Sequence, residues 1–510
     1  MIRRSPHPNW RPPIPSLKPS TRFFGTLGSV GRSRRAGLAP IAGLAFLLAS
    51  WTAAAQNRPF PQGAGYAQGF LPANLTAEDA RDVYEKWKRK YLKADCGGGT
   101  YRVEFNSPKG STVSEGMGYG MLLTAYFGDR AEFDGLWEFA RRNLNSLGVM
   151  GWKVTCGGFV QSEGGGASAT DGDNDIALAL LLAVDQWGEA YRQPALDFLK
   201  AVKAHDYATC SATGRTLATA GDWDKGCNDG GSNTSYWMPA YFRVFQEFSG
   251  DAFWGKAADD AVALWLASRN PTTGLIANHV TQNGVAGQGQ DRVDYNGCRI
   301  PWRAALDYLW FATPGAKGVM DTMTDWVDSN GIGTRVDGYN PNGTPTPGSK
   351  WKGSQCWNGG WATAAMSKSQ DRVDRFTAHF RSLRSDNYYE TSLRALYMLT
   401  LTGNAWKPGS VAGGGRVGRG DARAPGSSRE GGQREAGRVL GQDGGRGSAG
   451  GAGAREKPIA RNCGCGNGGS ASLGALLSIA VFVARRRRPV LPQDRLHLYD
   501  DSLPFPPESR

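Results

Sequence analysis

The stretch Ser114-Glu115-Gly116-Met117-Gly118-Tyr119-Gly120-Met121 marks a place where a Gly-rich loop turns into an apolar helix. A second stretch, Ala169-Thr170-Asp171-Gly172-Asp173-Asn174-Asp175-Ile176-Ala177, has the same character. Each puts one acidic side chain, Glu115 or Asp171, at the beginning of a helix with apolar later turns. Two carboxylates held in this way are suited to proton transfer with a bound substrate.

Outward from these two stretches, the chain shows apolar residues at helical spacing again and again. We expect helices at about 76–91, 116–127, 131–146, 174–188, 193–205, 235–249, 254–267, 300–312, 317–328, 359–367, 371–383 and 387–401. Few segments alternate with a period of two. The pattern predicts an all-α domain of helical hairpins, and twelve helices favour a closed ring of six hairpins.

Charge and composition divide the 510 residues into four segments. Residues 56–408, the predicted folded domain, carry 35 basic and 37 acidic residues, so the formal charge of +13 comes from the two ends. A nucleic-acid partner is not expected, because the basic surface that binds nucleic acid would have to lie on the folded domain. Residues 409–462 are rich in Gly, Arg and Ser and indicate a flexible linker.

Residues 1–55 are typical of an export signal region. Arg32, Arg34 and Arg35 precede an apolar run over 37–51, and Ala53-Ala54-Ala55 follows as a small-residue cleavage site. We therefore expect a secreted or cell-surface protein. The alternative is a buried N-terminal helix.

Residues 463–510 contain Cys463-Gly464-Cys465, an apolar run over 471–484 and four arginines over 485–488. Together with the linker, this arrangement resembles the C-terminal sorting tags of myxobacterial surface proteins. It implies membrane or cell-surface attachment, although 14 apolar residues are short for a membrane span. A disordered tail is the alternative.

Six cysteines lie in the predicted folded domain, and an even number in an exported chain favours disulfides. They are Cys96, Cys156, Cys210, Cys227, Cys298 and Cys356. Fifteen pairings are open, of which Cys210 with Cys227 is the most local. Buried free thiols are the alternative. No spacing indicates zinc, and the residues from Asp171 onward fail the calcium-loop pattern at Ile176 and Leu182. No metal or organic cofactor is expected.

Five segments, in this order, resemble the motifs of glycoside hydrolase family 8. They are Ser114–Met121, Val149–Trp152, Ala169–Ala177, Asn233–Tyr236 and Cys298–Arg303. The resemblance spans about residues 70–405. It implies an (α/α)6 barrel with a substrate cleft across one end, which hydrolyses β-1,4-linked glycans with inversion of configuration.

The resemblance makes Glu115 the general acid, which must be protonated when the leaving oxygen departs. It makes Asp171 a catalytic-site residue that binds the sugar ring beside the scissile bond. Many family members carry an Asp as general base where this chain has Asn296, and a neutral amide cannot take a proton from water. Some subgroups with Asn there take the base from an inserted loop. If that loop is extended, Asp294 points to the same side as Asn296, so we favour Asp294 over Asp291.

Aromatic rings suit sugars because the apolar face of a pyranose stacks on them. The residues expected to contact the substrate are Tyr119, Trp152, Tyr236, Tyr295, Arg299 and Trp302. Trp351, Trp357 and Trp361 could extend the cleft. Core packing is the alternative for each tryptophan.

The sequence thus predicts a monomeric, endo-acting glycoside hydrolase with a polysaccharide substrate. Cellulose or mixed-linkage β-glucan is the first expectation, and chitosan or xylan the second. Because Asn296 replaces the usual base, a surface glycan-binding protein without turnover is the alternative of another class.

Overall fold

The computed structural model describes residues 57–105 and 107–410. All of these residues lie within one unit of the chain, Ala54–Arg510. The predicted export region, the predicted surface anchor and all but the first two residues of the predicted linker lie outside the described residues. Among the described residues, no helix is long and apolar enough to cross a membrane.

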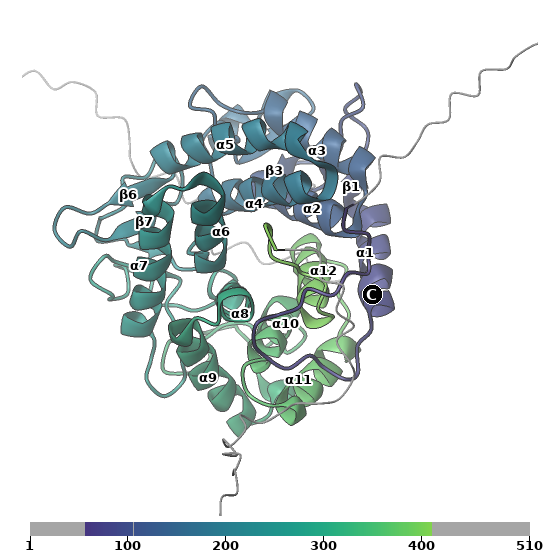
Figure 1. The fold of residues 1–510 in the computed structure, drawn as a ribbon. Helices are drawn as coiled ribbons and strands as arrows, with labels where there is room; N and C mark the ends of the chain where they lie inside the picture. The colour runs from purple at the N-terminus through teal and green to yellow at the C-terminus, as the bar shows by residue number, and fades with distance from the viewer. Residues whose placement is uncertain (1–56, 106, 411–510) are drawn as a thin grey trace, which may run out of the picture. The chain divides into compact units, whose positions relative to one another are not determined.

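Twelve α-helices form the framework of the described part, as the sequence predicted (Figure 1). They are α1 (Ala77–Tyr91), α2 (Ser114–Phe127), α3 (Arg130–Arg142), α4 (Thr170–Trp187), α5 (Arg192–His205), α6 (Pro239–Ser249), α7 (Ala252–Ser268), α8 (Ile300–Phe311), α9 (Pro314–Ser329), α10 (Gln355–Ala365), α11 (Gln370–Ser382) and α12 (Tyr388–Leu401). The even-numbered helices form an inner ring, in which each packs against the next and α12 packs against α2. The odd-numbered helices lie outside them, which is the (α/α)6 arrangement (Figure 1).

The ring closes through the two ends of the domain. Five hairpins join an inner helix to the outer helix that follows it, from α2 with α3 to α10 with α11. The sixth pair consists of the first helix, α1, and the last, α12, which pack against each other although they lie at opposite ends of the domain's sequence.

Burial explains why the inner helices have apolar residues on every side. All fourteen residues of α2 and all eleven of α10 are buried, whereas outer helices such as α1 and α3 bury one face. Glycines let α2 and α4 approach closely. A Cβ on Gly118 would lie 2.6 Å from the Cβ of Asp175, and one on Gly172 would lie 2.5 Å from the backbone of Ser114. The two acid-bearing helix starts are therefore neighbours.

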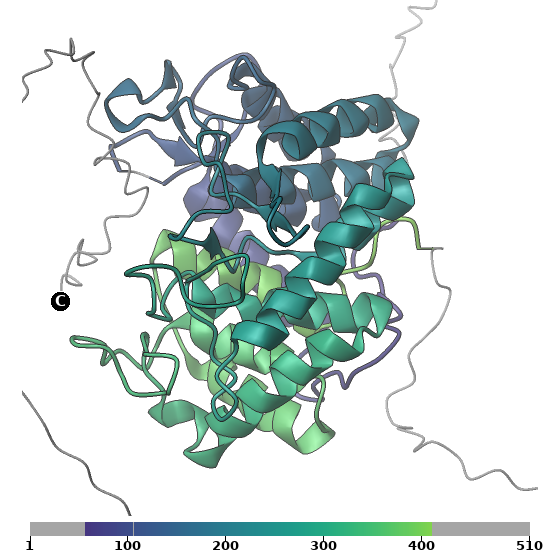
Figure 2. The same cartoon turned by 90° about the vertical axis from the view of Figure 1, so that its left-hand side faces the viewer.

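The connections differ between the two ends of the ring. Outer helices follow inner ones through short turns such as 128–129, 250–251 and 312–313. Most of the loops that lead into inner helices are long, among them 143–169, 206–238, 269–299 and 330–354, whereas the loop 383–387 before α12 is short. Figure 2 shows the ring from the side, with long loops gathered at the left. The N-terminal ends of the inner helices all face this loop-covered end.

Short antiparallel strands stiffen these loops. The pairs are β1 (Leu92–Lys93) with β2 (Arg102–Val103), β3 (Thr112–Val113) with β4 (Lys153–Thr155), β4 with β5 (Gly158–Phe159), β6 (Tyr207–Thr209) with β7 (Thr216–Ala218), and β8 (Ser232–Asn233) with β9 (His279–Val280). The pair β3–β4, in which Thr112 lies opposite Val154, comes immediately before α2 and fixes the approach of the chain to Glu115.

Six cysteines form three disulfides, Cys96–Cys156, Cys210–Cys227 and Cys298–Cys356. This confirms the predicted disulfide bonding. The pairing, which the sequence left open, includes the most local option, Cys210–Cys227.

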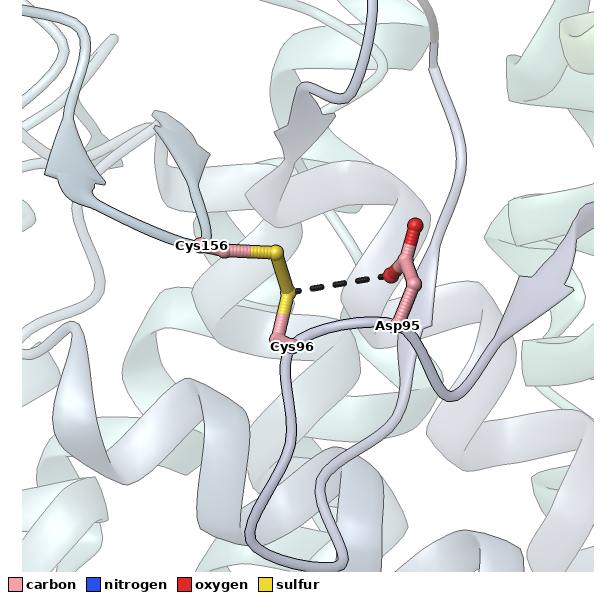
Figure 3. Close-up of side chains that lie close together, drawn as sticks. All are labelled: Asp95, Cys96 and Cys156. Carbon is pink, nitrogen blue, oxygen red and sulfur yellow. Dashed lines mark hydrogen bonds between the residues drawn. A yellow bond between two sulfur atoms is a disulfide. The ribbon is translucent and has the colours of Figure 1, made fainter.

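Figure 3 shows the first disulfide beside Asp95, whose Oδ1 lies 3.7 Å from Cys96 Sγ. Among the described residues these three side chains come closest to a metal-ligand grouping. Both sulfurs are used in the disulfide, so neither offers the thiolate that binds metal. The Asp95 carboxylate is paired with Arg102 at 2.5 Å.

Candidate active site

Glu115 stands in the first turn of α2, at the loop-covered end of the ring, and is 5% exposed. Tyr388, in the first turn of α12, donates a hydrogen bond from its hydroxyl to Glu115 Oε1 at 3.4 Å. Asp171 occupies the corresponding place on α4 and is 3% exposed. The first turns of three neighbouring inner helices therefore converge on one small volume.

Arg299 connects the two predicted catalytic carboxylates. Its Nη1 donates to Asp171 Oδ2 at 2.6 Å and to Glu115 Oε2 at 3.0 Å. Its Nη2 donates to Asn296 Oδ1 at 3.3 Å. A guanidinium is planar and permanently charged, so it fixes both carboxyl groups and the amide relative to one another. The structure thus brings together Glu115, Asp171, Asn296 and Arg299.

Burial raises the pKa of Glu115 to about 8. The Arg299 charge opposes this effect, while the neighbouring Asp171 and Asp175 carboxylates add to the rise in pKa. At neutral pH the Glu115 carboxyl is therefore mostly protonated, as a proton donor must be.

A buried ion pair supports the site from below. Arg303 donates from Nη1 and Nη2 to the two carboxylate oxygens of Asp175, both at 2.9 Å, and Nη1 also donates to the Tyr241 hydroxyl at 2.7 Å. The pair joins α8 to α4, one helical turn beyond Arg299 and Asp171. Its loss would leave an uncompensated charge in the core, so it fixes the two helices in register.

The segment 149–152 is tied to the starts of both α2 and α4. The backbone N–H of Met150 donates to Asp173 Oδ1 at 3.0 Å, and the N–H of Ser114 donates to the Trp152 carbonyl at 2.9 Å. Trp152 is half-buried, and its indole N–H is buried without a hydrogen-bond partner among the described residues. The predicted contact between Trp152 and the substrate stays a prediction.

Two predicted tyrosines lie around Arg299. The ring of Tyr236 is 5.5 Å from the guanidinium carbon, and Tyr295 precedes Asn296 directly. Tyr295 is half-buried and packs edge-on against Tyr389 at 6.2 Å.

Tyr119 and Trp302 are buried, contrary to the prediction that they contact the substrate. Tyr119 is 0% exposed, and its hydroxyl accepts a hydrogen bond from Arg299 at 3.4 Å. Trp302 is 2% exposed and donates from its indole to Thr400 of α12 at 3.1 Å. Both side chains pack inside the ring because the inner helices are buried on all sides. Trp357 and Trp361 are buried and stacked on each other, so they do not extend a cleft either.

The reason given for Asp294 as the base is also wrong. The backbone N–H of Cys298 donates to the Asp294 carbonyl at 2.9 Å, and Asn296 has helical angles of φ −77° and ψ −53°. The segment is a helical turn, in which residues two apart diverge by about 200°. Asp294 is half-buried and accepts from Asn278 Nδ2 at 2.6 Å, whereas Asp291 is exposed. The identification of Asp294 as the base stays a prediction.

Sequence reasoning missed Tyr388 and the pair Asp175–Arg303. One signal could have found Tyr388: like Glu115 and Asp171, it lies in the first turn of a helix of the inner ring. The ion pair joins residues that are 128 positions apart, and no local sequence pattern predicts such a contact.

Comparison with known proteins places these residues in a family. Residues 59–403 match the family model described as "Glycosyl hydrolases family 8". A relative named Beta-glucanase, from Niallia circulans, is 33% identical over 398 residues, which are 71% of this chain and 95% of that protein. Endoglucanase A of Acetivibrio thermocellus is 33% identical over 358 residues, which are 67% of this chain and 71% of that protein.

A solved structure agrees with the fold. The apo structure of a β-1,3-1,4-glucanase from Paenibacillus sp. X4 superposes with a TM-score of 0.62 at 29% sequence identity. The match covers 69% of this chain and 99% of that one. The two proteins therefore share the same helical fold.

Proposed function

This chain belongs to glycosyl hydrolases family 8 and is therefore a glycoside hydrolase, and from that premise we propose that it cleaves β-1,4-linked glucan within the chain and inverts the anomeric carbon. Cellulose and mixed-linkage β-glucan are the proposed substrates, because the relatives with 33% identity are named as a β-glucanase and an endoglucanase.

The observation that carries the proposal is a buried Glu115, whose pKa burial raises to about 8, beside the Asp171–Arg299 pair. Glu115 gives its proton to the glycosidic oxygen as the bond from that oxygen to the anomeric carbon breaks, and the leaving sugar departs as an alcohol. A water molecule attacks the anomeric carbon from the opposite face and loses a proton to a second carboxylate. Asp171, fixed by Arg299 at 2.6 Å, can accept hydrogen bonds from sugar hydroxyls with its remaining lone pairs.

Asp294 is the proposed second carboxylate. It belongs to the loop that leads into α8, two residues before Asn296, which is held by Arg299. Asn278 donates to its Oδ1 at 2.6 Å and accepts from its backbone N–H at 3.1 Å, so the side chain has a defined position. An inverting pair requires carboxyl groups roughly 6.5–9.5 Å apart, with room for water between them.

Release of reducing sugar from carboxymethylcellulose, mixed-linkage β-glucan, xylan and chitosan tests the substrate. Release from the first two supports the proposal, and release from xylan or chitosan alone redirects it to those glycans. NMR of the first products should show the α-anomer, since a β-linkage is inverted. Binding with no release from any glycan would favour a glycan-binding protein, the alternative that Asn296 raises.

Two substitutions test the proposed carboxylates. Glu115→Gln should lower kcat by about 10²–10⁴-fold, because it removes the general acid and keeps the shape of the side chain. Asp294→Asn should abolish turnover and leave glycan binding intact. If Asp291→Asn abolishes turnover and Asp294→Asn does not, Asp291 is the base.

We also propose that the protein is exported and reaches the cell surface. Three disulfides within the described residues support this, because disulfides persist in oxidising compartments. The arginine-preceded apolar run before Ala53-Ala54-Ala55 is the corresponding sequence signal. Cell fractionation and the N-terminal sequence of the mature protein test the proposal. A cytoplasmic protein that retains residues 1–55 would refute it.

A further inference from the structure

The loop 330–354, which leads into α10, lies beside the active-site loop that leads into α8. Val293 and Tyr339 form an antiparallel bridge, with N–H to O distances of 2.8 and 2.9 Å. Tyr295 lies two residues after Val293, and Asp337 lies two residues before Tyr339. Positions offset in this way along an antiparallel bridge come close together.

Asp337 connects the two loops by its side chain. Tyr295 donates from its hydroxyl to Asp337 Oδ2 at 3.3 Å, and the backbone N–H of Trp351 donates to Asp337 Oδ1 at 3.2 Å. Asp337 is half-buried, so its carboxylate has a fixed position and remains within reach of solvent. Each of its oxygens still has a lone pair for a further donor.

Trp351 presents an exposed indole next to this carboxylate. Its side chain is 37% exposed, which is unusual among the large apolar residues that the structure describes. The indole lies against the backbone at Gly353, where an added Cβ would be 2.6 Å from its Nε1. The chain behind the ring supports the indole, and part of its surface faces solvent.

We propose that Trp351, Asp337 and Tyr295 form a sugar-binding subsite for the glucan chain, outside the catalytic centre. An exposed indole stacks on the apolar face of a pyranose, and a fixed carboxylate accepts hydrogen bonds from its hydroxyl groups.

The subsite is joined to the catalytic centre by short contacts. Tyr295 is bonded to Asn296, whose Oδ1 accepts from Arg299 at 3.3 Å, and Arg299 donates to Glu115 at 3.0 Å. All of these residues lie on loops or first turns at the same end of the ring. Under this proposal, a chain of several sugars bound across Glu115 extends to Trp351, and a disaccharide at the catalytic centre does not. The inference rests on the proposed glucanase function and adds a preference for long substrates.

Calorimetry on the Glu115→Gln chain, which should bind substrate while cleaving it about 10²–10⁴-fold more slowly, tests the subsite. In that background, Trp351→Ala should weaken binding of cellohexaose at least about tenfold and leave cellobiose binding unchanged. Trp351→Phe should restore most of the affinity, because a smaller ring still stacks. Leu147→Ala, which removes another exposed apolar side chain of the loop end, is the matched control and should bind both sugars as the parent does.

The outcomes separate this inference from the proposed function. If the wild-type protein hydrolyses β-glucan but Trp351→Ala binds cellohexaose as the parent does, the subsite is refuted and the function stands. If Trp351→Ala weakens the binding of cellohexaose and of cellobiose equally, the residue acts through the catalytic centre and the separate subsite is also refuted. If the wild type cleaves no glucan and the Glu115→Gln chain binds none, both proposals fail.

Discussion

Replacing Glu115 by glutamine should stabilise the protein even as it removes activity. The carboxyl group is 5% exposed, and burial raises its pKa from 4.5 to about 8. Between these two values the folded state holds a proton that the unfolded state has released. The contribution of the protonated Glu115 carboxyl to the free energy of unfolding is therefore fully present below pH 4.5 and is lost as the pH rises through 8. Glutamine has nearly the same shape and does not ionise, so the variant does not lose stability in this way as the pH rises.

The size of the effect follows from the linkage relation. For a pKa of about 8 in the folded state, Glu115→Gln should gain close to nothing at pH 4, about 3 kcal/mol at pH 7 and about 4 kcal/mol at pH 8. A gain of this kind is expected where an active site keeps a destabilised group for its chemistry.

Urea unfolding of the wild type and of Glu115→Gln at pH 4, 5.5, 7 and 8 measures the effect. Glu138→Gln is the control, because Arg141 and Arg142 hold the pKa of Glu138 below its usual value. Its replacement should therefore lose a little stability at pH 7. A Glu115→Gln gain that does not increase between pH 4 and pH 8 would refute the reasoning that this acid is protonated in the folded state.

Two further predictions concern catalysis. In the wild type, kcat/KM should fall above pH about 8 as Glu115 loses its proton, and a fall that begins near pH 5 would contradict its role as the acid. The disulfide Cys298–Cys356 fixes the residue before Arg299 to the first turn of α10, so replacing both cysteines by alanine should lower kcat at least about tenfold at a temperature where the chain stays folded. The matched control is the double alanine variant of Cys210 and Cys227. The loss of chain-entropy stabilisation is about 4 kcal/mol for the Cys298–Cys356 loop and about 3 kcal/mol for the Cys210–Cys227 loop. The free energy of unfolding should therefore fall by similar amounts in the two variants, whereas kcat should fall only in the Cys298–Cys356 variant. Equal kcat values would show that the Cys298–Cys356 link does not position the site.

The number and place of the helices could be predicted from the sequence because helix formation is signalled locally. Apolar residues recur with the helical period, and polar or glycine residues end each run. The same local signals placed Glu115 and Asp171 at helix starts. Cys210 and Cys227 are only 17 residues apart, so their pairing was also within reach.

Other features depend on contacts between distant residues. Arg299 meets Glu115 across 184 positions, and α1 pairs with α12 only because the ring closes. The burial of Trp302 shows the same limit, since a motif residue can support the site from the core as well as line its surface.

The sequence by itself therefore determined which residues begin the inner helices and which chemistry they carry, because those signals lie within a few residues of each other. Only the tertiary structure decided that these helix starts converge around Arg299, and that burial keeps a proton on Glu115. A pKa depends on solvent exclusion and on charges contributed by helices far apart in the chain, and neither exists before the ring has closed.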